Sequence, residues 1–177
     1  DGKQHHYAAG FNGLNGRADF RNKNMPDDRA MLLRRDHGLR CLAWRKEGDH
    51  VLLCGQIPWD ASVQHIEFNA WLGFAVQQLR QFTERRIVFR PHPLGPQGER
   101  YGCEYSTLPL GEDLIGAHAC VTFNSNSAVE AAIEGVPPFA FDKGSMVYGY
   151  ASNWFRQIEQ PNTWDRHQWL NDLAYAQ

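Results

Sequence analysis

From residue 50 onward, short apolar runs alternate with segments whose apolar residues recur at helical spacing. The apolar runs cover residues 50–55, 86–90, 118–123 and 136–141. The helical segments between them cover residues 63–84, 110–117 and 127–134. Continuous apolar runs are typical of parallel strands that are buried on both faces. The alternation therefore predicts an α/β fold, a Rossmann-like doubly wound parallel sheet with helices on both of its faces.

The two ends of the chain follow different patterns. Residues 1–49 are polar, basic and rich in glycine, which predicts an irregular extension. Within it we expect a short helix over residues 27–33, capped by Asp27, and a strand or an extended lead-in over residues 39–44. Residues 150–160 and 163–176 predict two C-terminal helices, the second capped by Thr163. We therefore divide the chain into an irregular extension, 1–49, and a Rossmann-like domain, 50–177.

The loops that follow the predicted strands are the places to look for chemistry, because ligands of doubly wound sheets bind beyond the carboxyl ends of the strands. The loop after the first strand carries an amide, a carboxylate and a hydroxyl, on Gln56, Asp60 and Ser62. These groups suit a sugar or an acceptor. An ordinary turn, with Asp60 or Ser62 capping the next helix, explains them equally well.

The second strand ends in Arg90-Pro91-His92-Pro93. The two prolines restrict the backbone on both sides of His92 and hold its imidazole in a defined position. Arg90 and His92 together are able to bind a phosphate through charge-assisted hydrogen bonds. A proline-rich strand end without function is the alternative.

The third strand runs through Asn124 into Ser125, Asn126 and Ser127, where a helix begins. Free backbone N–H groups at a helix start bind anions, and these three side chains add further donors. Glu130, on the first turn, is placed to accept hydrogen bonds from a ribose if a nucleotide phosphate binds there. Simple capping by Ser125 or Ser127 is the alternative interpretation.

Taken in order, these motifs resemble the nucleotide-sugar half of GT-B glycosyltransferases, in particular the capsular polysaccharide β-Kdo transferases. The resemblance covers about 100 residues, from Val51 to Tyr148. It rests on Gly55-Gln56 with Asp60-Ala61-Ser62, on Arg90-Pro91-His92-Pro93, on Ser125, Ser127 and Glu130-Ala131, on Gly135-Val136-Pro137, and on Gly144 and Tyr148. Pro138 departs from the family pattern, which has an apolar strand residue there.

The resemblance implies a glycosyltransferase that moves a sugar from a nucleotide donor, CMP-Kdo-like, to a glycan or other acceptor hydroxyl. It implies that Arg90, His92, Ser125, Asn126 and Ser127 hold the phosphate, with His92 stabilising the charge on the departing group. Such enzymes need no metal and no further cofactor. Asp60 and His65 are the nearby candidates for the general base, and we assign Asp60.

Two further hypotheses stand beside the glycosyltransferase, and the length of the chain raises the first of them. The chain has 177 residues, about half of a two-domain GT-B enzyme. It is therefore either a fragment or reduced relative, such as phages encode, or a non-catalytic nucleotide-binding module that needs a partner. A third hypothesis is a phage enzyme that glycosylates a DNA base, for which the extension offers basic residues: Arg17, Arg21, Lys23, Arg29, Arg34, Arg35, Arg40 and Arg45. Interspersed aspartates favour a solvated face over a nucleic-acid surface.

Composition limits the partners and the cellular compartment that we expect for the protein. With 18 basic and 20 acidic residues the net charge is -2, which excludes a general binder of nucleic acid or of membrane surfaces. No apolar run approaches the length of a transmembrane helix, and residues 1–6 lack the layout of a signal peptide. Cys54 and Cys120 lie in apolar runs, as reduced core cysteines do, so we expect a cytoplasmic protein. Six tryptophans are many for this length, and we expect some in the core and some between copies of a homo-oligomer.

Overall fold

The computed structural model describes residues 11–13 and 15–176, so residues 1–10 of the expected extension, with the segment examined for a signal peptide, lie outside the described part. The strands are β1 (His50–Cys54), β2 (Arg86–Arg90), β3 (Glu104–Tyr105), β4 (Ala117–Thr122) and β5 (Pro138–Ala140). The helices are α1 (Asp28–His37), α2 (Phe68–Phe82), α3 (Leu110–Leu114), α4 (Ser127–Ile133) and α5 (Arg166–Tyr175). Short 3-10 turns cover Asn15–Arg17 and Phe155–Gln157.

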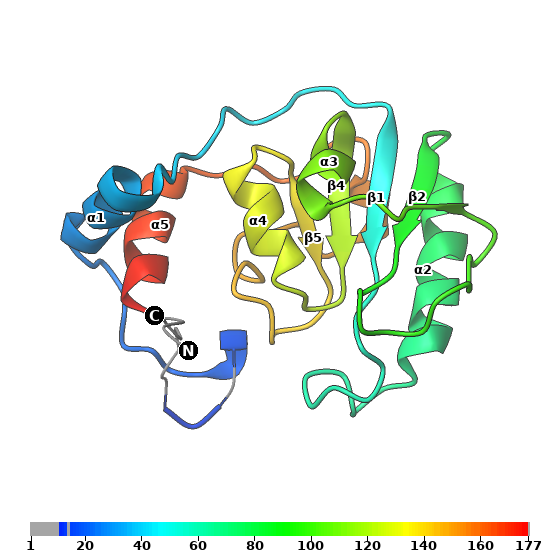
Figure 1. Cartoon of the computed structure of the whole chain (residues 1–177), viewed down its shortest axis with the longest axis horizontal. Coiled ribbons are helices and arrows are strands. Elements are labelled where there is room, and N and C mark those ends of the chain that lie inside the picture. The colour runs from blue at the N-terminus through cyan, green and yellow to red at the C-terminus, as the bar shows by residue number, and fades with distance from the viewer. Residues whose placement is uncertain (1–10, 14, 177) are drawn as a thin grey trace, which may run out of the picture.

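All five strands are parallel and lie in the order β3-β2-β1-β4-β5 (Figure 1). The chain begins in the centre at β1, moves outward through β2 to β3, and then crosses over to β4 and β5. The direction of winding reverses between β1 and β4, and at such a point the loops on the two sides separate and leave a crevice. The predicted doubly wound parallel sheet is confirmed.

Alternate residues of β1 are buried on opposite faces of the sheet. Val51 and Leu53 pack with the apolar side of α2, whereas Leu52 and Cys54 pack with α3 and α4. All five residues of β1 are buried. Two covered faces favour apolar residues, which is why residues 51–54 form a continuous apolar run. The polar His50 at the start of the strand is buried with its ring nitrogens within hydrogen-bond distance of Asp49 Oδ1 and Asp113 O.

Helices α1 and α5 pack against each other beside α4, at the edge of the sheet where β5 lies (Figure 1). A separate buried cluster joins them to α4, through Ala30 of α1, Trp169 and Leu170 of α5, and Ala128 and Ala132 of α4. The only helix of the described extension is therefore anchored by the C-terminal helix. The division of the chain at residue 49 stays a prediction.

The helix expected over residues 150–160 is wrong, and only the turn Phe155–Gln157 is helical there. Ser152 forms an isolated parallel bridge with Phe139 of β5. Its backbone N–H donates to Pro138 O at 3.3 Å, and its carbonyl accepts from Ala140 N at 3.0 Å. The open edge of β5 thus takes the hydrogen bonds that a helix would have used internally.

Three boundaries also differ from expectation. The cap of α5 is Asp165, whose Oδ1 accepts from His167 N at 2.9 Å, and Thr163 lies outside the helix. Asp27 precedes α1 but makes no side-chain capping bond. Helix α2 begins at Phe68 because residues 60–66 form successive tight turns. Of the two alternatives expected for residues 39–44, the structure shows the extended lead-in: Leu42 N donates to Ile133 O, at the end of α4, at 2.8 Å.

Cys54 and Cys120 are core residues, as expected. Cys54 and Cys120 are buried, and their Sγ atoms are 3.7 Å apart without a disulfide. The hydrogen bond from Cys54, together with burial, raises the pKa of the Cys120 thiol well above its usual range. Within residues 11–13 and 15–176, no helix is both long enough and apolar enough to cross a membrane.

Candidate functional site

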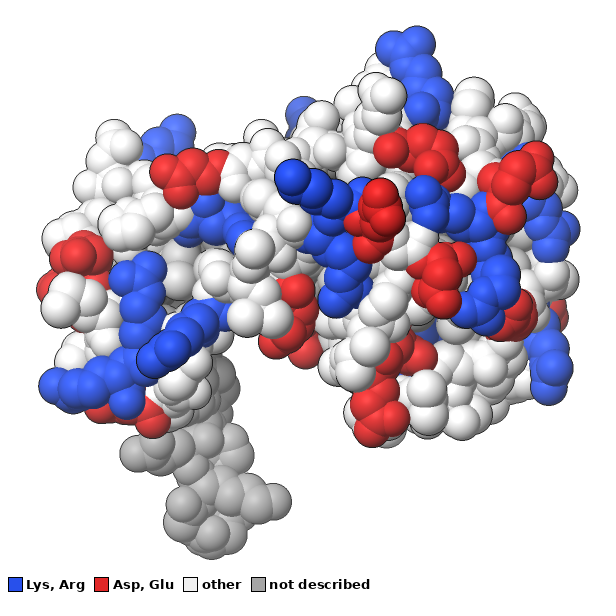
Figure 2. Space-filling view, turned by 90° about the horizontal axis from the view of Figure 1, so that it is seen from above, with Lys and Arg blue, Asp and Glu red and all other residues white. Residues whose placement is uncertain are grey.

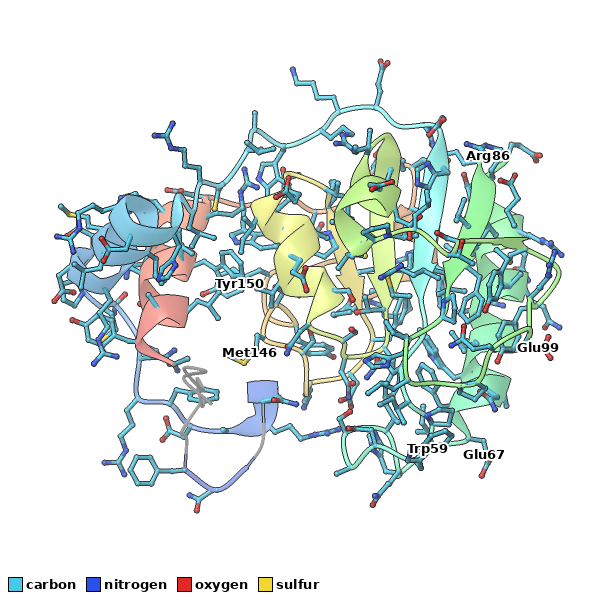
Figure 3. The ribbon with its side chains drawn as sticks, in the orientation of Figure 1. Trp59, Glu67, Arg86, Glu99, Met146 and Tyr150 are labelled. Carbon is cyan, nitrogen blue, oxygen red and sulfur yellow. The ribbon has the colours of Figure 1, made fainter. Side chains whose placement is uncertain are left out.

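The three polar loops lie together at the carboxyl edge of the sheet. In Figure 3, Trp59 marks the loop after β1 at the lower edge, and Arg86 marks the start of β2 at the upper edge. Because β1, β2 and β4 are parallel neighbours, the loops that follow them leave the sheet at the same edge. The expectation that these loops converge is therefore met by the topology.

Two adjoining cavities open between these loops, and every predicted site residue lines at least one of them. The first, of about 220 Å³, includes Gln56, Asp60 and Ser62 in its wall. The second, of about 260 Å³, includes Arg90, Ser127 and Glu130. His92, Ser125 and Asn126 belong to both walls. These three residues therefore stand between the cavities.

Gln56 and Asn124 tie the loop after β1 to the loop after β4. Gln56 Nε2 donates to Asn124 Oδ1 at 2.7 Å, and Asn124 N donates to Gln56 Oε1 at 3.0 Å. The Asn124 side chain also donates to Ser62 O at 2.9 Å and to Asp142 Oδ1 at 2.8 Å. Asn124 is 4% exposed. It serves as the central link of the first cavity, and each polar atom of the Gln56 side chain already has one partner.

Asp142 extends this network to the N-terminal part of the chain. Arg17 Nη2 pairs with Asp142 Oδ2 at 2.5 Å and lies 3.5 Å from His65 Nε2. His65 Nε2 is itself 3.6 Å from the same carboxylate oxygen. A nitrogen that accepts a hydrogen bond from Arg17 has no free lone pair for a substrate proton. This arrangement favours Asp60 over His65 as the base.

Asp60 is held as a carboxylate. Hydrogen bonding from Ser62, by its side chain and then by its backbone N–H at 2.8 Å, lowers the pKa of Asp60. The charge of His92 adds a smaller effect in the same direction. A general base must be ionised at the working pH, and Asp60 satisfies this condition.

His92 has a fixed orientation. Its Nδ1 accepts a hydrogen bond from Leu94 N at 3.1 Å, so the neutral ring carries its proton on Nε2. Gly95 N and Gln97 Nε2 both donate to the His92 carbonyl, at 2.9 and 3.0 Å. The loop thus holds the backbone on both sides of a ring whose Nε2–H remains available to a ligand.

The Arg90 guanidinium is held by partners within the protein. Its Nη1 pairs with Asp113 Oδ2 at 3.2 Å and also donates to Leu108 O. The Asp113 side chain is 3% exposed, and its other oxygen accepts from Ser106 Oγ at 2.5 Å. Orientation by a buried carboxylate leaves the rest of the Arg90 guanidinium to line the second cavity.

The serines at the start of α4 bond to each other. Ser125 Oγ lies 3.0 Å from Ser127 Oγ and accepts from Ser127 N at 3.2 Å. The capping role expected as the alternative is therefore real for Ser125. Asn126 stands at the N-cap position but makes no side-chain capping bond, and its amide remains exposed between the cavities. Capping thus accounts for one of the three polar side chains.

Glu130 lies exposed on α4 at the edge of the second cavity, yet nearby protein removes enough water to raise its pKa. Arg90 counteracts this shift, and Glu134 adds to it. A raised pKa means that the folded chain binds the proton more tightly than the unfolded chain does. The stability gained from protonated Glu130 is complete below the unfolded pKa and is lost as the pH rises through the folded one.

We expect the free energy of unfolding of Glu130→Gln to increase relative to the unchanged chain as the pH rises from about 4 to about 7. Glutamine does not titrate, so only the unchanged chain loses stability over this range. Urea unfolding at several pH values measures the difference. Glu99→Gln, in an exposed loop away from the site, is the control, and an equal trend in both variants would contradict the assignment.

The sequence did not single out Asn124, Asp142 or Arg17 as site residues. Asp142 is the second residue after β5, so the rule that polar residues after parallel strands face the site would have found it. Asn124 lay within the recognised polar turn. Nothing in the sequence indicated that Arg17 pairs with a residue 125 positions away.

A larger hollow, of about 750 Å³, lies beside residues 81–85 and Glu159. Its charged groups pair with each other, Arg85 with Glu159 at 3.1 Å. It lies at the end of α2 and the start of β2, away from the carboxyl edge of the sheet. Size alone therefore does not mark the candidate site.

Comparison with solved structures identifies the architecture. Thermosulfurimonas dismutans KpsC, a β-Kdo 2,7 transferase, is similar to this chain with a TM-score of 0.61 and 20% identity, over 88% of this chain and 55% of that one. The chain has the fold of half a GT-B glycosyltransferase. The expected half-GT-B architecture and its likeness to capsular Kdo transferases are confirmed.

A second similar structure is the β-Kdo 2,4 transferase of Thermosulfurimonas dismutans KpsC, with a TM-score of 0.48 and 16% identity, over 84% of this chain and 53% of that one. This chain spans about half the length of both solved structures. No protein-family model matches the sequence, and no curated protein matches it significantly. Identity this low establishes the fold, and the donor and chemistry must be argued from the site.

Proposed function

We propose that the two cavities bind a nucleotide sugar, a CMP-linked sugar acid such as CMP-Kdo, and that the chain takes part in moving the sugar to an acceptor hydroxyl. The observation that carries the proposal is the position of His92 between the cavities, with its ring orientation fixed by Leu94 N. The bond that breaks in such a reaction joins the sugar to the phosphate. A hydrogen-bond donor such as the His92 ring, placed on the border between the two cavities, can contact the phosphate oxygen of that bond.

The chemistry of the walls assigns each half of the donor to a cavity. Arg90, Ser127 and Glu130 line the 260 Å³ cavity, where cation and hydroxyl bind phosphate and the carboxylate accepts from ribose hydroxyls. Gln56, Asp60 and Ser62 line the 220 Å³ cavity, where an amide, a carboxylate and a hydroxyl suit the sugar and the acceptor. Ser125, Asn126 and His92 would contact the phosphate from the shared wall.

In the proposed transfer, the bond between the anomeric carbon and the phosphate oxygen breaks as the acceptor oxygen bonds to that carbon. The phosphate oxygen keeps the electron pair, and His92 Nε2–H and Arg90 stabilise its growing charge. The proton of the acceptor hydroxyl passes to the Asp60 carboxylate. These residues supply charge stabilisation and a base without any metal ion or further cofactor in the proposal.

Calorimetric titration with CMP, UDP and GDP tests the donor. We expect saturable binding of CMP and weaker binding of the other two. The absence of binding by all three nucleotides would end the proposal.

A donor hydrolysis assay with CMP-Kdo then separates a transferase from a binding module that needs a partner. Release of CMP by the chain alone would support catalysis. Binding of CMP without release, with turnover appearing only when a second chain is added, would support the module.

A further inference from the structure

The basic residues of the N-terminal extension mostly have partners within the protein. Ion pairs, carbonyl contacts or aromatic rings engage Arg17, Arg21, Arg29, Arg35 and Arg45. Four others form no hydrogen bond or ion pair with any residue in the ranges 11–13 and 15–176: Lys23, Arg34, Arg40 and Lys46. Of these, Arg34 and Arg40 line the same cavity.

This cavity, of about 400 Å³, lies between α1, the extended segment after it, and the start of α5. Arg34 comes from α1 and Arg40 from the extended segment, while Arg166 and His167 begin α5. The remaining wall consists of Cys41, Trp44, Trp164 and Asp165. Figure 2 shows Lys and Arg side chains, with Asp and Glu among them, at the end of the molecule that carries α1 and α5. Three arginines and one histidine thus face a single carboxylate.

Arg34 and Arg166 both lie near the Cys41 thiol. Arg34 and Arg166 both act on the thiol of Cys41, each opposing the rise in its pKa that burial causes. Arg166 lies 3.8 Å above the Trp44 ring and donates to Ala132 O and Leu42 O. Asp165 is the acidic residue in this wall, and its Oδ1 accepts from His167 N. The positive charge of Arg34 and Arg40 is therefore not balanced by a carboxylate bonded to either guanidinium.

The aromatic wall behind these cations is rigid. The rings of Trp44 and Trp164 have centroids 4.8 Å apart, and Trp44 Nε1 donates to Trp164 O at 2.9 Å. Tyr150 stacks on Trp164 at 5.6 Å. Arg34 and Arg40 bring like charges to this cavity without a bonded carboxylate, and like charges repel each other. An anion bound between them would offset this repulsion.

We propose that this cavity is a second ligand site that binds a phosphate group, carried by a small molecule or by a lipid, through Arg34, Arg40 and Arg166. Guanidinium groups bind phosphate oxygens in pairs of parallel hydrogen bonds, which suits several arginines around one opening. The proposal goes beyond the nucleotide-sugar site and does not depend on it.

The two sites lie at opposite ends of α4. The segment that carries Arg40 bonds to the carboxyl end of that helix, where Leu42 N donates to Ile133 O and Arg45 N to Gly135 O. Ser125 and Ser127 of the nucleotide-sugar site lie at its other end. Seven helical residues correspond to about 10 Å, so separate variants address the two sites.

Calorimetric titration of the full chain with inorganic phosphate and with pyrophosphate, at low ionic strength, tests the site. We expect the double variant Arg34→Gln/Arg40→Gln to bind at least about tenfold more weakly, since each lost charge-assisted bond is worth about a tenfold change or more. Arg35→Gln is the matched control, because Arg35 is the next residue on α1 and pairs with Asp36. Phosphate binding at the nucleotide-sugar site should weaken in His92→Ala, whereas the part of the binding that depends on Arg34 and Arg40 should remain.

Vesicles distinguish the source of the phosphate. Co-sedimentation with phosphatidylcholine vesicles, with and without phosphatidic acid, detects a lipid-borne phosphate monoester. Arginine-dependent binding of inorganic phosphate or pyrophosphate supports a small-molecule ligand, and arginine-dependent binding of phosphatidic acid vesicles alone supports a lipid. The proposal is overturned if inorganic phosphate, pyrophosphate and phosphatidic acid vesicles all fail to bind. It is also overturned if Arg35→Gln weakens binding as much as the double variant does, or if only His92→Ala abolishes binding.

Discussion

His92→Ala should weaken nucleotide binding by about 1.5–3 kcal/mol, a loss of roughly 10–150-fold in affinity. The expected loss is that of a hydrogen bond to a charged phosphate, which is stronger than a bond between neutral groups. His92 Nδ1 is already used by Leu94 N. The loss therefore reports on Nε2–H, the atom assigned to the phosphate.

Calorimetry with CMP measures this change, and His37→Ala provides the control. His37 is exposed at the end of α1, far along the chain from the candidate site. Thermal unfolding of both variants should resemble that of the unchanged chain, because the His92 side chain contributes one local hydrogen bond to the fold. If His92→Ala bound CMP as tightly as the unchanged chain, His92 would not belong to the site.

Asn124→Ala should lower the free energy of unfolding by about 2–4 kcal/mol. The buried Asn124 side chain makes three hydrogen bonds, with Gln56, with Ser62 and with the carboxylate of Asp142. Alanine leaves the Ser62 carbonyl and the Asp142 oxygen without this donor in a place that water reaches poorly. Unsatisfied buried groups, above all charged ones, cost more than the average hydrogen bond gains.

Urea unfolding measures this effect, and Asn126→Ala is a matched control only two residues away. Asn126 is exposed and makes no side-chain capping bond, so its replacement should change stability by less than about 0.5 kcal/mol. We also expect hydrogen exchange to quicken in the loops after β1 and β4 of Asn124→Ala, because Asn124 joins them. Equal stability of the two variants would show that this link does not hold the loops.

Local patterns were sufficient where burial leaves a sequence few alternatives. Strand β1 was predicted because both of its faces are covered, so the four residues that follow His50 are apolar. The two-residue strand β3 was missed because Glu104 and Tyr105 are too few to form a pattern. The segment 150–160 was misassigned since its helical spacing competes with the open edge of β5, an edge that exists only after the sheet has formed.

The same distinction applies to the candidate site. His92 and the polar turn of Ser125 and Ser127 were found because each motif is contiguous and follows a predictable strand. The roles of Asn124 and Asp142 were not found, because their partners come from other loops. Asp165 was not recognised as the cap of α5, since Thr163 offered an equivalent local signal.

The sequence by itself determined the order of β1, α2, β2, α3, β4, α4 and β5, the doubly wound class and the three loops in which polar residues follow parallel strands. It did so because burial on two faces and restricted turns leave signatures within a few neighbouring residues. Only the tertiary structure decided that His92 stands between two cavities, that Arg17 reaches Asp142, and that Arg34 and Arg40 meet Arg166. These contacts join residues far apart in the chain, and their geometry depends on the packing of the whole fold.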